Sequence, residues 1–242
     1  MTAMIGGADC ASARLASTRA GWHRVAEHMP ASALYRATGH TGLVPSPGGF
    51  WPPSFGTDAR FLAVDGTELV VSGAAGTKRT PLTTVRAAAE FAGVTPGAPA
   101  GVSGPAAPPD LDAPLMIEPG AARLLAEWYG LGAQPLSRLA AEIPGDKPAG
   151  PVLWPAHFDA GMTAAAISYG ASPGDDHITD PYLYAGPHDG PPPGDPAFWD
   201  APSGSALIFG QAGTVAEAAA FFGDDRARVL AHATTTPTGR TS

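Results

Sequence analysis

The chain has 242 residues, of which 44% are hydrophobic and only 15% are charged, and its formal net charge is −8. This length is sufficient for one large domain with its own hydrophobic core. The 14 Lys and Arg residues are scattered along the chain, with Lys78-Arg79 the only adjacent pair, which argues against nucleic-acid binding, because phosphate recognition needs a clustered basic surface. No apolar run approaches the ~20 residues of a membrane-spanning helix, so no membrane association is expected.

The N-terminal residues lack the basic region and sustained apolar segment of a secretory signal, so a cytoplasmic location is the expectation. The single cysteine, Cys10, cannot form an internal disulfide or a thiolate metal cage. A small molecule is the expected partner. The sequence leaves the oligomeric state open.

The first half of the chain is predicted to begin with two helices after a disordered start over residues 1–11. Apolar residues recur at helical spacing over 12–28, and Pro30 begins a second, short helix that Gly39 ends. The residues from 42 to 44 are predicted to form a strand, which a rigid proline-rich loop follows.

Two apolar runs then flank the pair Asp65-Gly66, which predicts a β-hairpin because glycine tolerates the positive φ of a tight turn. A helix that begins at Thr83 or Thr84 is expected to end at Gly93. Six prolines lie in the next stretch, 94–117, which is predicted to be an extended surface linker.

The second half is predicted to start with a helix over 121–143, which Pro135 should break or kink. A further helix is expected over 214–222. Strand-like apolar runs lie between these helices, at 164–169, 181–185 and 205–209.

Each half, 12–93 and 118–232, therefore has the order helix, strands, helix. The segments 84–93 and 214–223 share six of ten residues, which is typical of an internal duplication, although alanine-rich helices also match by chance. We expect one compact α+β domain, in which an antiparallel sheet or an open barrel is packed against helices.

The most distinctive stretch is 151–159, which holds the only His-x-Asp pair of the chain, His157 and Asp159. If this stretch is extended, both side chains project from one face while Phe158 points into the core. A carboxylate beside an imidazole raises its basicity and fixes its orientation, as a general base requires. The alternative is a histidine and an aspartate that only stabilise a turn.

Aromatic residues near this pair could form a ligand pocket, because such pockets are mostly apolar with a few polar groups. Tyr182 and Tyr184 would share one strand face. The predicted pocket residues are Trp154, Phe158, Tyr182, Tyr184 and Trp199. The alternative is that these rings are the core and rim of a small sheet.

A divalent metal is the one cofactor that the sequence suggests. Asp175, Asp176 and His177 lie in one loop, and with His157 and Asp159 they could supply the ligands. Their spacing matches no calcium-loop or zinc motif, so a solvated acidic loop is the alternative. A phosphate-binding loop and a Gly-x-Ser-x-Gly elbow are both missing.

The segments 153–159, 169–176 and 181–184 resemble a family of high-GC bacterial proteins of uncharacterised activity. Its members carry Trp-Pro-Glu-His-Phe-Asp, then Tyr-Gly-x-Ser-Pro-Gly-Asp and Pro-Tyr-Leu-Tyr. The resemblance extends into the first half and implies a bacterial protein, but it brings no assigned reaction. Ala156 stands in this chain where the family has Glu.

Three hypotheses follow from these patterns. The first is a small-molecule enzyme in which His157 acts as general base, oriented by Asp159, above an aromatic pocket. The second is a metal-binding protein that uses His157, Asp159, His177 and an aspartate of the loop at 175–176. The third is a non-catalytic ligand-binding or structural protein, in which the same stretch only shapes the fold.

Overall fold

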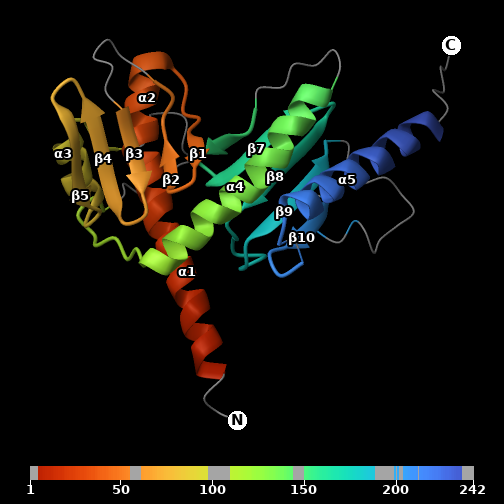
Figure 1. The fold of residues 1–242 in the computed structure, drawn as a ribbon, viewed down its shortest axis with the longest axis horizontal. Helices are drawn as coiled ribbons and strands as arrows, with labels where there is room; N and C mark the ends of the chain where they lie inside the picture. The colour runs from red at the N-terminus through yellow and green to blue at the C-terminus, as the bar shows by residue number, and fades with distance from the viewer. Residues whose placement is uncertain are drawn as a thin grey trace.

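The computed structural model describes residues 5–54, 61–97, 110–143, 150–188, 199, 201, 204–211 and 213–235, with the backbone alone at 5–10 and 232–235. These residues form five helices and ten strands (Figure 1). The strands make two five-stranded antiparallel sheets in which neighbours in sequence are neighbours in space. The prediction of an α+β fold with an antiparallel sheet and packed helices is confirmed, and both sheets are open in the described part.

The first half contains α1 (Ile5–His28), α2 (Pro30–Thr38) and, after its sheet, α3 (Val85–Ala92). Its strands are β1 (Val44–Ser46), β2 (Gly49–Trp51), β3 (Phe61–Asp65), β4 (Glu68–Gly73) and β5 (Gly76–Pro81). Because α1 begins at Ile5, the prediction of disorder up to residue 11 is wrong from residue 5 onward. Residues 5–11 contain no proline to interrupt the helix, although Gly6 and Gly7 have low helix propensity.

The C-terminal ends of α2 and α3, the N-terminal cap of α3 and the β3–β4 hairpin are as predicted. Gly39 and Gly93 adopt the left-handed conformation that ends α2 and α3, with φ of 77° and 65°. The Thr84 side chain accepts a hydrogen bond from the backbone N–H of Ala87 and so caps α3. Asp65 pairs with Glu68 across the β3–β4 turn.

The second half contains α4 (Pro119–Glu142) and, after its sheet, α5 (Val215–Thr235). Its strands are β6 (Val152–Trp154), β7 (Asp159–Ala164), β8 (Ile167–Ser172), β9 (Tyr182–Pro187) and β10 (Ser205–Ile208). The predicted break at Pro135 is wrong, because α4 continues through it. Buried Trp128 and Leu136 pack on either side of this proline and hold the helix against the sheet.

The predicted strand over 164–169 is in fact a hairpin. Ala164 pairs with Ile167, and Ala165 and Ala166 form the turn with φ of 51° and 61°. Left-handed φ is uncommon for residues other than glycine and asparagine, so two alanines gave no turn signal.

The two sheets meet edge to edge at β1 and β6. Leu43 and Leu153 exchange two backbone hydrogen bonds, each of 2.9 Å, in an isolated antiparallel bridge. The first hairpin of each sheet therefore lies at the centre of the molecule.

The described residues pack into two hydrophobic clusters. The first is shared by both halves, since it joins α1, α3 and the first sheet to Tyr129 of α4 and to Leu153 and Phe158. The second lies between the second sheet and the helices α4 and α5, which cover one face of that sheet (Figure 1). The opposite face of the second sheet carries the candidate site.

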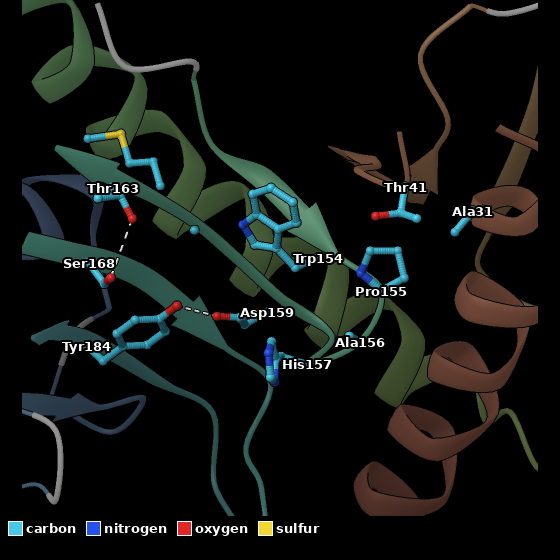
Figure 2. Close-up of a pocket in the computed structure, with 12 residues that line it drawn as sticks. Ala31, Thr41, Trp154, Pro155, Ala156, His157, Asp159, Thr163, Ser168 and Tyr184 are labelled. Atoms are coloured by element: carbon cyan, nitrogen blue, oxygen red, sulfur yellow. Dashed lines mark hydrogen bonds between the residues drawn. The ribbon is translucent and has the colours of Figure 1, made fainter. Parts of the chain in front are cut away.

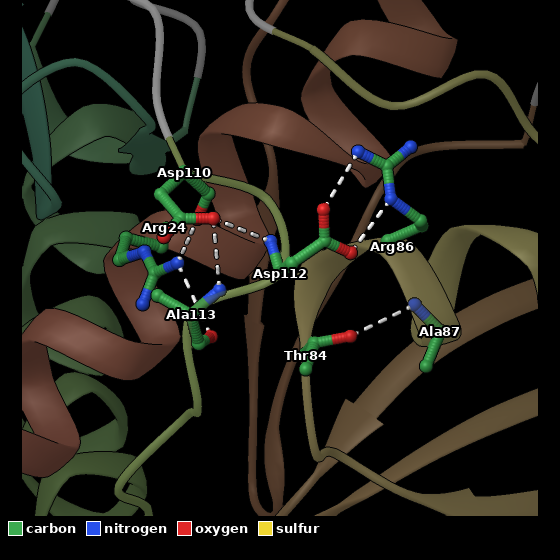
Figure 3. A network of polar contacts seen from close by, with 7 residues as sticks. All are labelled: Arg24, Thr84, Arg86, Ala87, Asp110, Asp112 and Ala113. Carbon is green, nitrogen blue, oxygen red and sulfur yellow. Dashed lines mark hydrogen bonds and ion pairs between the residues drawn. The ribbon is translucent and has the colours of Figure 1, made fainter.

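Residues 98–109 of the predicted linker lie outside the described part of the chain. Its final residues are bound to the first half, as Figure 3 shows. Arg24 of α1 donates to the backbone oxygen of Asp110, and Arg86 of α3 forms an ion pair with Asp112 at 2.7 Å. Leu115 is buried in the shared core. This part of the segment therefore does not run freely over the surface.

In the described residues, none of the helices is both long and apolar enough to span a bilayer.

Candidate functional site

The turn at 155–158, between β6 and β7, is held by three hydrogen bonds. The N–H of Phe158 donates to the carbonyl of Trp154 at 2.7 Å. Tyr129 of α4 donates its hydroxyl to the carbonyl of Phe158 at 2.6 Å. His23 of α1 lies with Nε2 2.7 Å from the carbonyl oxygen of Pro155. Two helices from different halves of the chain thus fix the backbone of this turn.

The ring of Phe158 anchors the turn in the core. It is 1% exposed and stacks on the imidazole of His23 with ring centroids 5.2 Å apart. Phe50 and Tyr129 meet it edge-on, at 5.8 and 5.7 Å. The backbone of Phe158 has a φ of 57°, a conformation that costs a non-glycine residue roughly 1–2 kcal/mol. This strained backbone conformation is retained because the contacts of the Phe158 ring fix the residue in place.

His23 acts on the turn as a neutral donor. Burial lowers its pKa, against the opposing effect of its bond to Pro155. A carbonyl oxygen can only accept, so in the neutral ring the proton lies on Nε2. His23 was not singled out by the sequence, because nothing local connects it to a turn far along the chain.

Above this turn lies a cavity of about 390 Å³ (Figure 2). The size is within the range of small-molecule sites. Trp154, His157 and Asp159 come from the turn and its flanking strands, and Tyr184 comes from β9. The remaining lining residues are Ala31, Thr41, Pro155, Ala156, Gly161, Met162, Thr163 and Ser168.

Glycines in the middle of β7 and β8 allow Tyr184 to reach this site. Gly161 pairs with Gly170, which in turn pairs with Tyr184. A Cβ atom at Gly170 would lie 2.4 Å from the Tyr184 ring, and one at Gly161 would lie 2.9 Å from its hydroxyl. The ring therefore lies over a bare strip of backbone, and its hydroxyl extends across to Asp159.

Asp159 and Tyr184 are the two cavity residues whose pKa is shifted. The Oδ2 of Asp159 accepts a short hydrogen bond from the Tyr184 hydroxyl, and its Oδ1 is buried without a hydrogen-bond partner. Burial raises the pKa of Asp159, although the bond from Tyr184 and the nearby His157 oppose the shift. Burial and the neighbouring Asp159 also raise the pKa of Tyr184. Burial thus shifts both groups of the pair toward their protonated forms.

The other end of the cavity carries hydroxyl groups. Thr163 and Ser168 face each other across β7 and β8 with their oxygens 3.5 Å apart. The hydroxyl of Ser168 also lies 3.1 Å from Nε2 of His188. Because side chains alternate between the two faces of a strand, Thr163 and Ser168 lie on the same face of the sheet as Asp159. The sequence could have indicated them only with the strand register known.

Four of the predicted site residues come together: Trp154, His157, Asp159 and Tyr184 all line the cavity. His157 is exposed, and it lies on a turn instead of an extended strand. Other predicted pocket residues lie elsewhere. Phe158 is in the core, Tyr182 donates its hydroxyl to Asp175 at 2.6 Å, and the half-buried Trp199 does not line this cavity.

The residues predicted to bind a metal do not gather. In the described part of the chain, which includes all five of them, His, Cys, Asp and Glu residues form no group of three or more that could hold a metal ion. Asp175 instead stabilises its own loop, because its Oδ1 accepts from the N–H groups of His177 and Ile178 at 2.6 and 2.8 Å. Partial burial raises the pKa of Asp175, but these bonds and that of Tyr182 outweigh it, and the net shift is downward.

Comparison of the chain with protein-family models, with curated proteins and with solved structures gives no match. Any functional assignment therefore depends on the cavity itself, and in particular on the Asp159–Tyr184 pair beside His157.

Proposed function

We propose that this cavity is the active site of a small-molecule enzyme that moves protons between Asp159, His157 and a bound ligand. The observation that carries the proposal is the state of Asp159. One of its oxygens is held by Tyr184 and the other is buried without a hydrogen-bond partner, while the residue itself lines the cavity. A buried polar atom without a partner costs about 1–3 kcal/mol, and proteins retain such a cost mainly at functional sites.

The raised pKa of Asp159 supports a catalytic role, because an acid–base group works best when its pKa lies closer to the working pH. Tyr184 fixes the orientation of the carboxyl group by its hydrogen bond. The sequence pattern suggested His157 as the base and Asp159 as its orienting partner. The geometry favours a different assignment of roles. Asp159 is oriented by Tyr184, and His157 is a second proton carrier at the cavity wall.

The burial of individual residues argues against a purely structural stretch. Phe158 and Pro155 are buried and shape the turn, whereas His157 and Trp154 are exposed beside the cavity. Exposed side chains contribute little to folding stability, so a structural role accounts for the first pair and not for the second. The reaction class is proton transfer at a neutral small molecule, such as an isomerisation, an elimination or a hydrolysis.

The internal duplication stays part of this proposal. A helix of 24 residues precedes a five-stranded meander in both halves, and a helix closes each half. In this interpretation, the first half is scaffold and the second half carries the site. The cytoplasmic location and the bacterial family expected from the sequence also stay predictions.

The proposal is tested by a search for compounds that the protein converts. Purified protein is incubated with a small-molecule extract of bacterial cells, and mass spectrometry identifies the compounds that it consumes or forms. Asp159→Asn keeps the acceptor for Tyr184 but cannot transfer a proton, so we expect the rate to fall about 10²–10⁴-fold, as for other acid–base groups. His157→Gln should lower the rate as well, with an unchanged melting temperature.

Asp65→Asn is the matched control, because it makes the same change at an exposed aspartate of the first sheet. It should keep the full rate. If Asp159→Asn turns over every compound as fast as the unaltered protein, or if no compound is converted at all, the cavity is not an acid–base active site.

A further inference from the structure

The second cavity beside the site extends it. This cavity has a volume of about 460 Å³ and lies between the end of α2 and the junction of β1 with β6. Trp154 and Thr41 line both cavities, so the Trp154 ring is the wall between them. The side chain of Trp154 is 45% exposed, unusually open for the largest apolar residue. A ligand that fills both cavities must pass over this ring.

The charges of the lining select against ionic ligands. Among the described residues that line either cavity there is no Lys or Arg, so a phosphate or carboxylate group would find no guanidinium or ammonium partner. Asp159 is the one acidic side chain among those residues, and its Oδ2 accepts the hydrogen bond of Tyr184 while its Oδ1 is buried. A cationic ligand would therefore find no carboxylate oxygen that is both accessible and without a partner. The preferred ligand is neutral.

The polar groups of the lining exclude a purely apolar ligand. Hydroxyl groups of Thr163, Ser168 and Tyr184 belong to residues that line the first cavity. Thr41 adds a further hydroxyl at the passage between the cavities. Thr163 and Ser168 bond to each other and Ser168 to His188, but an apolar molecule over these hydroxyl groups would remove their further hydrogen bonds to water, at a cost for each one. The ligand must present several donors and acceptors of its own.

We infer that the ligand of this site is a neutral saccharide of at least two rings, which stacks on Trp154 and spans the two cavities. Its hydroxyl groups would bond to the Thr, Ser and Asp side chains, while the C–H faces of its rings would pack on the exposed indole. The inference rests on the proposed small-molecule site and adds the chemical class of the ligand.

Binding to an array of defined glycans tests the inference without any need for turnover. Fluorescently labelled protein is applied to neutral and acidic glycans of one to six rings, and each hit is titrated by calorimetry. We expect neutral glycans of two or more rings to bind, with at least tenfold weaker binding of the corresponding monosaccharides. Trp154→Ala should weaken binding at least tenfold, and Trp154→Phe should restore part of it.

Trp51→Ala is the matched control. Trp51 packs on Phe61 in the first sheet and lines neither cavity, so its removal should leave the affinity unchanged. If no neutral glycan binds, if acidic glycans bind better, or if Trp154→Ala binds as well as the unaltered protein, the saccharide assignment is wrong.

The two proposals can fail separately. Turnover that depends on Asp159 and consumes a nucleoside or another compound that is not a saccharide would overturn the inference and keep the enzyme. Glycan binding that depends on Trp154, combined with no turnover of any saccharide, would keep the inference and overturn the enzyme.

Discussion

The first hairpins of the two sheets are neighbours in space and differ in what they expose. In the first half, Ser46 pairs with Gly49, so the β1–β2 turn is tight and lies against its own sheet. A Cβ atom at Gly48 would come within 2.1 Å of the Asp65 carboxylate. In the second half, Trp154 pairs with Asp159, which leaves a longer turn over 155–158. The longer turn inserts the ring of one residue into the core and presents others to a cavity.

The charged groups of the two sheets also differ in how far they are exposed. Arg79 lies 2.9 Å from both Asp65 and Glu68 on the exposed face of the first sheet. Asp159 of the second sheet has the hydroxyl of Tyr184 as its partner and is half-buried. Exposed ion pairs contribute little, whereas an acid that is buried without a counter-charge is costly to keep. The second sheet is therefore destabilised by the burial of Asp159, whereas the charged groups of the first sheet are exposed and carry no such cost.

The largest expected effect comes from removal of the aromatic anchor. Phe158→Ala should lower the free energy of unfolding by about 3–5 kcal/mol, because it deletes a fully buried ring from a packed core. Urea unfolding followed by circular dichroism measures this difference. Phe61→Ala is the counterpart in the first sheet, and because Phe61 is 39% exposed it should cost about 1 kcal/mol. Equal costs would show that the turn is not anchored by its ring.

A buried acid of the second half should give the next effect. Asp225 of α5 is fully buried, and its Oδ1 accepts a hydrogen bond of 2.9 Å from Ser205. Burial raises the pKa of Asp225 from 3.8 to about 6, although Ser205 and Arg228 oppose the shift. The folded state therefore holds its proton more tightly than the unfolded state, and stability falls as the pH rises from about 4 through about 6.

Asp225→Asn should remove this pH dependence. Above pH 7 the variant should gain up to about 3 kcal/mol relative to the unaltered protein, since two pKa units correspond to that energy. Thermal unfolding at a series of pH values measures the difference. Asp112→Asn is the control of opposite sign, because the hydrogen bonds from Arg86 lower the pKa of Asp112. Its contribution is present at neutral pH and is lost on acidification. Parallel pH profiles for the two variants would contradict the assignment of Asp225.

Local signals predicted much of the fold. The Asp65-Gly66 pair indicated its hairpin, and Gly39, Gly93 and Thr84 indicated helix ends, because each has a conformational preference that acts within a few residues. The strand β5 was not predicted. It is an exposed edge strand, and its Gly-Thr-Lys-Arg-Thr-Pro sequence has no apolar alternation.

The candidate site was predictable in part for the same reason. Trp154, His157 and Asp159 lie close together in sequence, so a pattern could gather them. The contact of Tyr184 with Asp159 depends instead on Gly161 of β7 and Gly170 of β8, which leave room for the ring. The hydrogen bonds from His23 and Tyr129 to the turn depend on how two distant helices pack, and a local sequence pattern does not contain that information.

The smallest expected effect compares one aspartate from each sheet. Burial raises the folded-state pKa of Asp159, so the folded state binds more protons than the unfolded state as the pH rises through that pKa. Its contribution to stability is therefore complete at low pH and declines as the pH increases. Relative to Asp159→Asn, the unaltered protein should lose free energy of unfolding as the pH rises above 3.8, the ordinary pKa of this carboxyl group. Urea unfolding at each pH checks the direction.

Salt separates this effect from that of the exposed pair on the first sheet. Asp65→Asn removes one partner of Arg79, and the small loss that it causes should disappear in about 1 M salt, where exposed charges are screened within about 3 Å. The pH dependence at Asp159 should persist in the same salt, because it originates from burial and not from a solvent-exposed partner. If salt removes both effects alike, Asp159 is an ordinary surface carboxylate, and the second sheet has no site that the first sheet lacks.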